Sequence, residues 1–146
     1  MTQLTSAKQI GAVSKPWAEM VDKLAKELDK LPQVVMQLEH HIHAGVYSRT
    51  GMQKKGVLCA AALLKVPTQL IVSGKCRIYC DGKVILVDGY RVLEGMPGRQ
   101  IVVYTEEDTW ATALFATNAK TVEEAEAEAV GKETVVRLVN HKENGQ

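Results

Sequence analysis

The sequence of 146 residues contains no run of about 20 apolar residues, the length that a helix needs to cross a bilayer. Residues 1–15 also lack the apolar stretch of a secretory signal. There are only three cysteines, and an odd number without a signal favours free thiols in a reducing compartment. These absences predict a soluble protein that is made in a cytoplasm and has no membrane partner.

Aromatic residues are scarce, at 5% of the chain, and they include a single phenylalanine, Phe115. Valine, leucine, isoleucine and alanine must therefore form most of the core. The apolar share of 46% is sufficient for such a core. A chain of this length fits one domain, because domains commonly contain about 100–150 residues.

Acidic residues are absent from His40 to Cys80, whereas Glu106 to Glu128 carries seven acidic residues and one lysine. These opposite charges predict two solvated faces, pairing within the fold or between copies, or an anionic partner for the basic segment. The net charge of +1 gives no strong attraction to nucleic acid or membrane, so neither is expected as a partner. The basic residues of the first segment are Arg49, Lys54, Lys55, Lys65, Lys75 and Arg77.

Residues 14–31 show the pattern of an amphipathic helix, and residues 1–13 that of a flexible arm. Ser14 is a suitable N-cap, Pro16 is tolerated in the first turn, and Pro32 ends the helix. The apolar stripe must pack against the chain's own barrel or a second copy. We favour a second copy, most simply in a homodimer, because Pro32 interrupts the chain between the predicted helix and the predicted barrel. The stripe consists of Trp17, Met20, Val21, Leu24, Leu28 and Leu31.

The segment from Gln33 to Thr117 consists of short β-forming runs punctuated by glycine, which is typical of a sandwich or barrel. Asp81-Gly82 predicts a type I′ turn, so the flanking strands should form a hairpin. The predicted strands cover residues 33–41, 44–50, 56–64, 68–74, 75–80, 83–89, 90–95, 100–105 and 109–117.

Residues 121–133 predict a short helix, with Thr121 and Glu124 as a capping box and Gly131 as the C-cap. Its apolar face is small, so we expect the helix to lie on the surface. Residues 134–139 are suitable for a last strand. The small apolar face contains Val122, Ala125, Ala129 and Val130.

The middle of the chain contains the segments HHIHAGVYSRT, LIVSGKCRIYCDGKVILVDGY, MPGRQIVVY and EEDTWATALFAT, which begin at residues 40, 70, 96 and 106. Together they resemble the cupin superfamily, and more closely a family of small cupin-like proteins encoded by tailed bacteriophages. The resemblance implies a mainly β fold with a cupin-like jelly-roll barrel at 33–120. It leaves an arm and helix at 1–32 and a helix and tail at 121–146. It also implies a protein made in the host cytoplasm, with the virion as a further location.

Enzymatic cupins hold a metal with two histidines and a glutamate from a first motif and another histidine from a second. With Gly74 as the glycine that ends the first motif, the first three ligand positions fall near Ala61, Leu63 and Pro67. The fourth falls near Ile101. None of these residues can bind a metal, and residues 56–73 contain no His, Glu or Asp. The resemblance therefore implies that the usual metal centre is absent.

Two other groups of residues are candidates for binding. His40, His41 and His43 could hold a divalent transition metal, since His41 and His43 would share one face of a strand, but no third ligand is evident. Alternatively they are structural imidazoles at a strand edge. A small anionic ligand could be bound by Tyr47, Arg49, Arg91 and Arg99.

No Gly-x-Ser-x-Gly elbow or glycine-rich phosphate loop is present, so catalysis is not the expected role. We expect a non-catalytic phage-encoded binding or assembly protein that acts as a homo-oligomer and needs no cofactor. It would be a virion or accessory component, or a protein that engages another phage or host protein. The alternative is a cupin enzyme or small-ligand binder that uses the histidine cluster.

Overall fold

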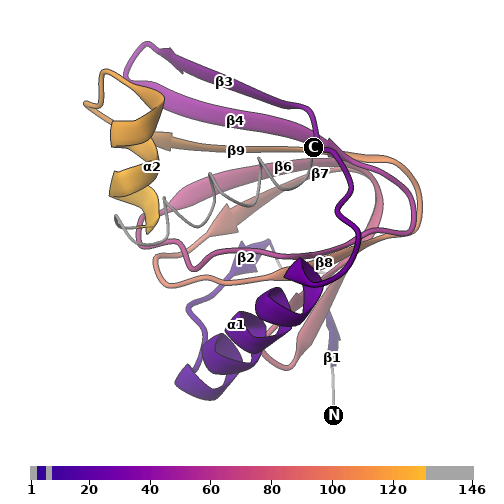
Figure 1. Cartoon of the computed structure of the whole chain (residues 1–146). Helices are drawn as coiled ribbons and strands as arrows, with labels where there is room; N and C mark the ends of the chain where they lie inside the picture. Colours follow the sequence, from indigo (N-terminus) through magenta and orange to yellow (C-terminus); the bar gives the residue numbers. More distant parts are fainter. Residues whose placement is uncertain (1–2, 6–7, 131–146) are drawn as a thin grey trace.

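The computed structural model describes residues 3–5 and 8–130 of the chain. Two sheets face each other, with one helix below the lower sheet and a second at the side of the barrel (Figure 1). This is the mainly β architecture with an N-terminal and a C-terminal helix that the sequence predicts. In chain order the elements are β1 (Gln3–Thr5), β2 (Gln9–Ile10), α1 (Lys15–Asp29), β3 (Leu38–His43), β4 (Val46–Gln53), β5 (Leu58–Ala60), β6 (Thr68–Cys80), β7 (Lys83–Gly95), β8 (Val102–Thr105), β9 (Thr109–Ala116) and α2 (Val122–Val130).

Strands β6 and β7 are long and pair along their whole length, so they run through both sheets. Residues 69–73 of β6 pair with β9, and residues 76–79 pair with β8. The upper sheet of Figure 1 therefore contains β3, β4 and β9 with one half of the long pair, and the lower sheet contains β5 and β8 with the other. The prediction that each of these regions contains two separate strands was wrong. Gly74 and Gly89, which suggested the breaks, lie opposite each other within the continuous pair.

The N-terminal segment is part of the sheet rather than a flexible arm, so that prediction was wrong for the described residues. β1 and β2 both pair with β7 in parallel, with Ile10 opposite Gly95. Ile10 is completely buried in the main core, together with Leu93. The edge of β7 that faces away from β6 would otherwise expose unpaired backbone groups, and the N-terminal strands cover part of it.

The predicted hairpin is confirmed. Cys80 pairs with Lys83, and Asp81 and Gly82 have φ angles of 43° and 83°, the positive values that a type I′ turn requires. The β3–β4 turn has the same property at Ala44 and Gly45, with φ of 55° and 75°. This second turn was not predicted from the sequence, because alanine seldom adopts a positive φ.

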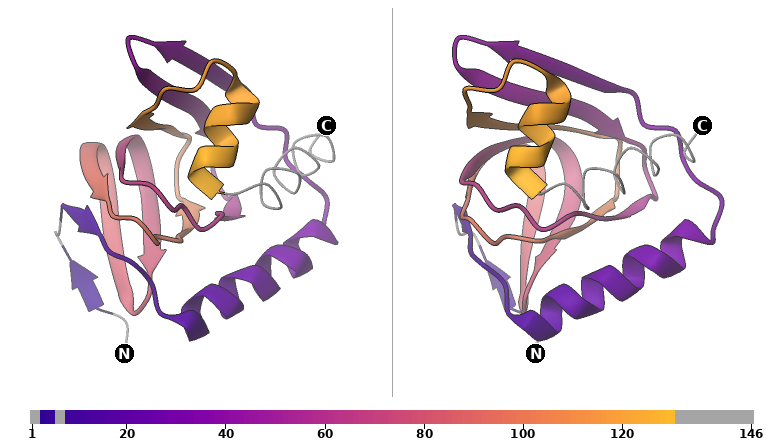
Figure 2. Two further views of the ribbon diagram at one scale, coloured as in Figure 1. Left: turned by 90° about the vertical axis from the view of Figure 1, so that its left-hand side faces the viewer. Right: turned by 60° about the vertical axis from the view of Figure 1, so that its left-hand side comes forward.

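Helix α1 begins as predicted, with the Ser14 hydroxyl accepting a hydrogen bond from the Trp17 backbone N–H at 3.4 Å. It lies against its own barrel (Figure 2). The Trp17 indole donates to the Gln100 carbonyl at 2.8 Å, and Val21 is completely buried. Met20 and Leu31 of the same stripe remain exposed. A contact between the stripe and a second copy stays a prediction, and such a contact would be made by the exposed residues Met20 and Leu31.

Helix α2 lies on the outside of the barrel, as predicted, with Glu123, Glu124 and Glu128 exposed, but its small apolar face is firmly packed. Ala125, Ala129 and Val130 are buried against Tyr47 and Phe115 in a second apolar cluster. Small side chains let the helix approach the two rings closely, which explains why such a short apolar face is sufficient.

The predicted cap of α2 is present, because the Thr121 hydroxyl accepts from the Glu124 N–H at 3.2 Å. Gly131 and the strand predicted at 134–139 lie outside the described residues. Among the helices that the structure describes, none is long and apolar enough to span a membrane.

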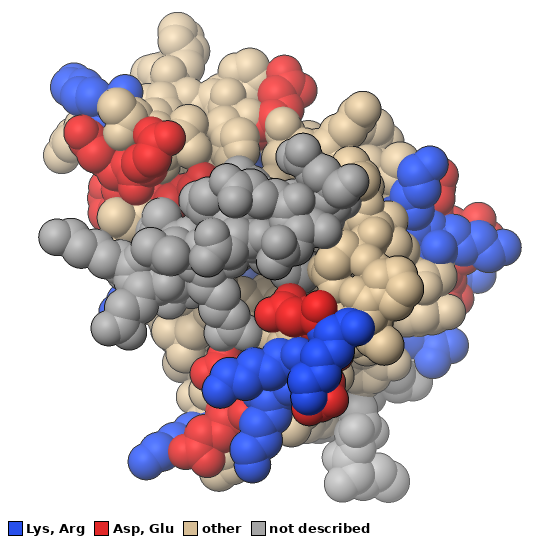
Figure 3. Space-filling model, in the orientation of Figure 1, with Lys and Arg blue, Asp and Glu red and all other residues tan. Residues whose placement is uncertain are grey.

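The basic and acidic segments meet where the lower sheet is exposed. Glu106 contacts Nε of Arg77 at 2.6 Å and Nζ of Lys75 at 3.8 Å. This ion pair lowers the pKa of the Glu106 carboxyl, mainly through the hydrogen bond from Arg77. Elsewhere both signs are mixed, as on the face of α1 visible in Figure 3. The predicted segregation of charge is thus partly neutralised within the fold.

Candidate functional site

The inner face of β4 carries the polar side chains that enter the barrel. Alternation along the strand turns Tyr47, Arg49 and Gly51 to the interior. Tyr47 pairs with Phe115 of β9, and Arg49 lies between His40 of β3 and Ala113 of β9. The structure therefore brings Tyr47 and Arg49 together, as the sequence predicts, and adds His40 from the histidine cluster.

Tyr47 is buried, and its hydroxyl lies 2.8 Å from Nδ1 of His40. The His40 and Tyr47 rings stack with centroids 6.0 Å apart, and Tyr47 meets the Phe115 ring edge-on at 5.3 Å. Burial, assisted by the nearby Glu126 carboxylate, raises the pKa of Tyr47 to about 12, while Arg49 acts in the opposite direction. Tyr47 is therefore neutral at ordinary pH, and the tautomer of His40 decides whether the hydroxyl or Nδ1 donates the hydrogen bond between them.

Arg49 is a half-buried cation at the centre of this group. Burial raises the pKa of the Cys59 thiol on β5, and the charge of Arg49 opposes that rise. The charge of Arg49 therefore acts on Tyr47 of the upper sheet and on Cys59 of the lower sheet. Within residues 3–5 and 8–130, its guanidinium makes no hydrogen bond or ion pair.

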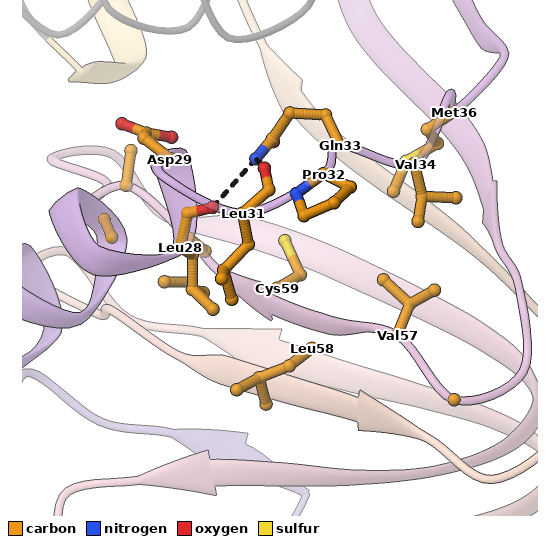
Figure 4. A pocket seen from close by; sticks show the side chains of 15 residues that line it. Leu28, Asp29, Leu31, Pro32, Gln33, Val34, Met36, Val57, Leu58 and Cys59 are labelled. Atoms are coloured by element: carbon orange, nitrogen blue, oxygen red, sulfur yellow. Dashed lines mark hydrogen bonds between the residues drawn. The ribbon is translucent and has the colours of Figure 1, made fainter. Parts of the chain in front are cut away.

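A groove of about 440 Å³ lies between the C-terminal end of α1, the linker to β3, and β5 (Figure 4). Among the described strands, β3 and β5 lie at the edges of their sheets, and the linker crosses the opening between them. The Gln33 amide donates to the carbonyls of Leu28 and Leu31, both at 2.8 Å, which closes the end of α1. The groove therefore opens at the side of the barrel where the two sheets are not joined.

The inner wall of the groove adjoins the polar group on β4. Cys59 and Met36 both line the groove. A side-chain carbon at Gly51 would lie 3.0 Å from the Met36 sulfur, so Met36 covers the position two residues from Arg49. The groove has no signature in the sequence, because it forms only when the linker spans two edge strands that are distant in sequence.

The positions that the family resemblance assigns to a metal lie in or beside the core. Ile101 is buried, and Ala61 packs against the same cluster. Ala61, Leu63, Pro67 and Ile101 offer no donor atom, so the residues at these positions do not fit the metal centre of enzymatic cupins.

The histidine cluster is divided between two faces of β3. Alternation turns His40 to the interior and His41 and His43 to the outside, where both are exposed. His41 Nε2 lies 2.9 Å from the Glu39 carboxylate. In the part of the chain that the structure describes, no three His, Cys, Asp or Glu side chains are grouped to hold an ion. His40 therefore does not share a face with His41 and His43, and a metal site at His41 and His43 would need ligands from elsewhere.

Arg99 and Arg91 do not join Tyr47 and Arg49. Arg99, in the segment between β7 and β8, is buried with its Nε donating to the hydroxyl of Thr68, the first residue of β6, at 3.0 Å, and burial lowers its pKa to about 10. Its side chain lies over Gly95, where a Cβ atom would be 2.6 Å from Cδ of Arg99. Arg91 is on β7, opposite Val72. Strand β9 separates β4 from β6, so the four-residue pocket that the sequence suggests is not assembled as one unit.

The raised pKa of Tyr47 predicts a loss of stability at alkaline pH. Tyrosine in the unfolded chain ionises near pH 10, whereas Tyr47 in the folded chain keeps its proton to about pH 12. The stabilising contribution is therefore complete below pH 10 and is lost as the pH rises through that window. Relative to Tyr47→Phe, the free energy of unfolding of the native chain should fall by about 1 kcal/mol by pH 11. Urea unfolding of both proteins across this range measures it, and parallel curves would contradict the burial of the phenol.

Comparison with known proteins finds no matching family model and no matching curated protein. A solved cupin superfamily protein from Desulfitobacterium hafniense is similar in structure, with a TM-score of 0.51 at 11% identity, covering 60% of this chain and 83% of that one.

Two further solved proteins are similar at lower scores. The EutQ protein of Clostridium difficile aligns at TM-score 0.48 and 10% identity, covering 65% of this chain and 74% of that one. The cupin domain of Schizosaccharomyces pombe Cnp3 aligns at TM-score 0.47 and 12% identity, covering 66% and 74%. The strand arrangement, together with the likeness to the Desulfitobacterium protein, shows that this chain has the jelly-roll fold of the cupin superfamily.

Proposed function

We propose that this chain is a non-catalytic binding protein that acts as a homo-oligomer, most simply a two-fold dimer. The observation that supports this is an exposed patch on the outer face of the upper sheet. Tyr90, Trp110 and Val92 on that face expose 67%, 54% and 45% of their surface. Large exposed apolar patches on soluble proteins usually mark interaction sites.

The patch follows from the strand register. Two rows of paired residues cross β4, β9, β6 and β7 on the outer face, and we call these eight residues the sheet patch. None of them is charged, although charged residues make up 24% of the chain. A sheet face exposed to water would normally carry polar and charged side chains. The rows are Met52, Trp110, Ser73 and Tyr90, and Thr50, Thr112, Ile71 and Val92.

A second copy of this chain is the occupant that fits the sheet patch. Two-fold symmetry places the same surface on both sides of an interface, and an uncharged surface meets itself without repulsion. Tryptophan and tyrosine are also the residues that most often dominate the binding energy of interfaces. The absence of metal donors near Ala61 and Ile101 supports the non-catalytic part of the proposal.

The finer role rests on the resemblance of residues 33–120 to small proteins of tailed bacteriophages. It supports a phage-encoded virion or accessory component, or a protein that engages a host factor, present in the host cytoplasm when made. A dimer through the sheet patch leaves α1 and the groove beside it available for such a partner.

Light scattering and sedimentation test the dimer. We expect the native chain to be dimeric at micromolar concentration and Trp110→Lys/Tyr90→Lys to be monomeric, with a dissociation constant raised at least about a hundredfold. Tyr104→Lys is the matched control, because Tyr104 is 38% exposed on the other sheet, outside the patch. A monomeric native chain, or a double variant that stays dimeric, would contradict the proposal.

A further inference from the structure

His41 and His43 are two side chains of metal-binding type on one strand, and alone they are too few to hold an ion. Alternation places both on the outer face of β3, where both are exposed. Imidazole is a preferred ligand of zinc, copper and nickel, and structural zinc sites almost always have four ligands. The described part of the chain groups no third His, Cys, Asp or Glu with them. The remaining ligands of such a site must therefore come from a second molecule.

The backbone of β3 shows how a second molecule can approach these histidines. Among the described strands β3 lies at the edge of the upper sheet and pairs with β4 alone (Figure 1). The Thr117 N–H donates to the Gly45 carbonyl at 2.9 Å, so the odd-numbered residues of β4 direct their backbone groups to β9 and the even-numbered ones to β3. The even-numbered residues pair with His41 and His43. Ile42, between them, therefore directs its N–H and C=O away from β4, where another strand can pair with them.

Antiparallel pairing of two β3 strands about a two-fold axis at Ile42 brings the histidines of both copies together. Ile42 then forms a hydrogen-bonded pair with Ile42 of the partner subunit, and His41 of each copy lies opposite His43 of the other. Opposite residues of this second kind of pair have Cα atoms about 4.5 Å apart. His41 and His43 of one chain are about 7 Å apart along the strand. All the imidazoles project from one face, because the axis is perpendicular to the extended sheet, and from these positions they can converge on one ion.

The surroundings of the two histidines suit a bound cation. Their neighbours on β4 are Ser48 beside His41 and Val46 beside His43, and neither is charged. The Glu39 carboxylate lies 2.9 Å from Nε2 of His41. An ionised carboxylate only accepts hydrogen bonds, so Nε2 carries the proton and Nδ1 keeps a lone pair for a metal. A carboxylate behind a ligating imidazole is the usual arrangement at zinc sites, where it orients the ring and makes it more basic.

We propose that a divalent transition metal such as zinc binds between two copies of this chain, held by His41 and His43 of both, where the edges of their β3 strands pair. The strands overlap only from His41 to His43, and the net contribution of so few backbone hydrogen bonds is small. Association along this edge therefore requires the metal. None of the ligands belongs to the sheet patch or to the core positions near Ala61 and Ile101, so the proposal does not depend on a dimer through the sheet patch.

Sedimentation of the full chain, without a histidine tag and with the Trp110→Lys/Tyr90→Lys changes, tests the site apart from the sheet patch. Zinc chloride should double the sedimenting mass, whatever that mass is without metal, and a chelator should reverse the change. Calorimetry should give about one zinc ion per two chains, as expected for four imidazole ligands. His41→Ala and His43→Ala each remove two ligands from the pair. Each should abolish the doubling and lower the affinity for zinc at least about a hundredfold.

Two control variants locate the metal and the strand pairing. His40→Gln changes the neighbouring histidine, which is turned to the interior, and should leave the effect of zinc unchanged. Ile42→Pro removes the N–H that the second strand needs and should prevent the doubling, with circular dichroism showing that the barrel stays folded, because proline is tolerated in edge strands. No change of mass with zinc would overturn the proposal. So would a loss with His40→Gln equal to that with His41→Ala, or a doubling that persists in His43→Ala or in folded Ile42→Pro.

Discussion

Replacing Gly74 with alanine should lower the free energy of unfolding by about 3–5 kcal/mol, enough to unfold much of a marginally stable domain. Gly74 has a φ angle of +148°, a conformation that residues with a Cβ atom rarely adopt. A Cβ atom at this position would lie 2.5 Å from the Thr109 hydroxyl and 2.7 Å from the Asp108 carbonyl. Strain of the backbone and steric overlap therefore add.

The overlap involves a part of the fold that has little room to move. β6 leaves β9 after residue 73 and joins β8 at residue 76, and the β8–β9 turn packs into this change of partner. Thr109 is almost completely buried there, and its hydroxyl accepts from the Lys75 N–H at 3.1 Å. Making space for a methyl group would break contacts that hold the two sheets together.

Gly89→Ala is the matched control for this prediction. Gly89 lies opposite Gly74 and also has a positive φ, of 106°, but a Cβ atom there would have no atom within 4 Å. The Gly89→Ala substitution should lower the free energy of unfolding by the backbone strain alone, about 1–2 kcal/mol. Urea unfolding followed by tryptophan fluorescence measures both variants. Equal losses would mean that the turn relaxes around the new methyl group.

The elements that the sequence predicts best are those whose signals are local. Ser14 and Pro32 bracket α1, and Asp81-Gly82 specifies the hairpin, because capping and turn chemistry act over a few residues. The continuity of β6 and β7 was missed because a glycine within a strand has the same sequence signature as a break. Only the pairing of Gly74 with Gly89, a tertiary contact, distinguishes the two.

In the candidate site, too, the residues with a local signal were predicted and those without one were missed. Tyr47 and Arg49 lie two apart on one strand, so alternation alone brings them to one face. The partner residues come from segments distant in sequence. Cys59 lies on β5 of the other sheet, where the charge of Arg49 opposes the rise of its pKa, and Met36 of the linker lies against Gly51, so neither has a signal that a single sequence displays.

The packing of α1 leads to the second prediction with a large effect. Val21→Asp should cost at least about 3 kcal/mol, because it places a carboxylate without a partner in a completely buried position. Met20→Asp, one residue earlier and 42% exposed, should cost less than about 1 kcal/mol. The comparison removes the effect of aspartate on helix propensity, since both positions lie in the same turn.

The same pair of variants separates the two surfaces available for self-association. If the exposed part of the α1 stripe contacts a second copy, Met20→Asp should dissociate the oligomer in light scattering without unfolding the chain. If the sheet patch is the contact, Met20→Asp should leave the oligomer intact, since Trp110 and Tyr90 lie on the other sheet. A Val21→Asp protein as stable as the native chain would show that α1 is not docked on its barrel in solution.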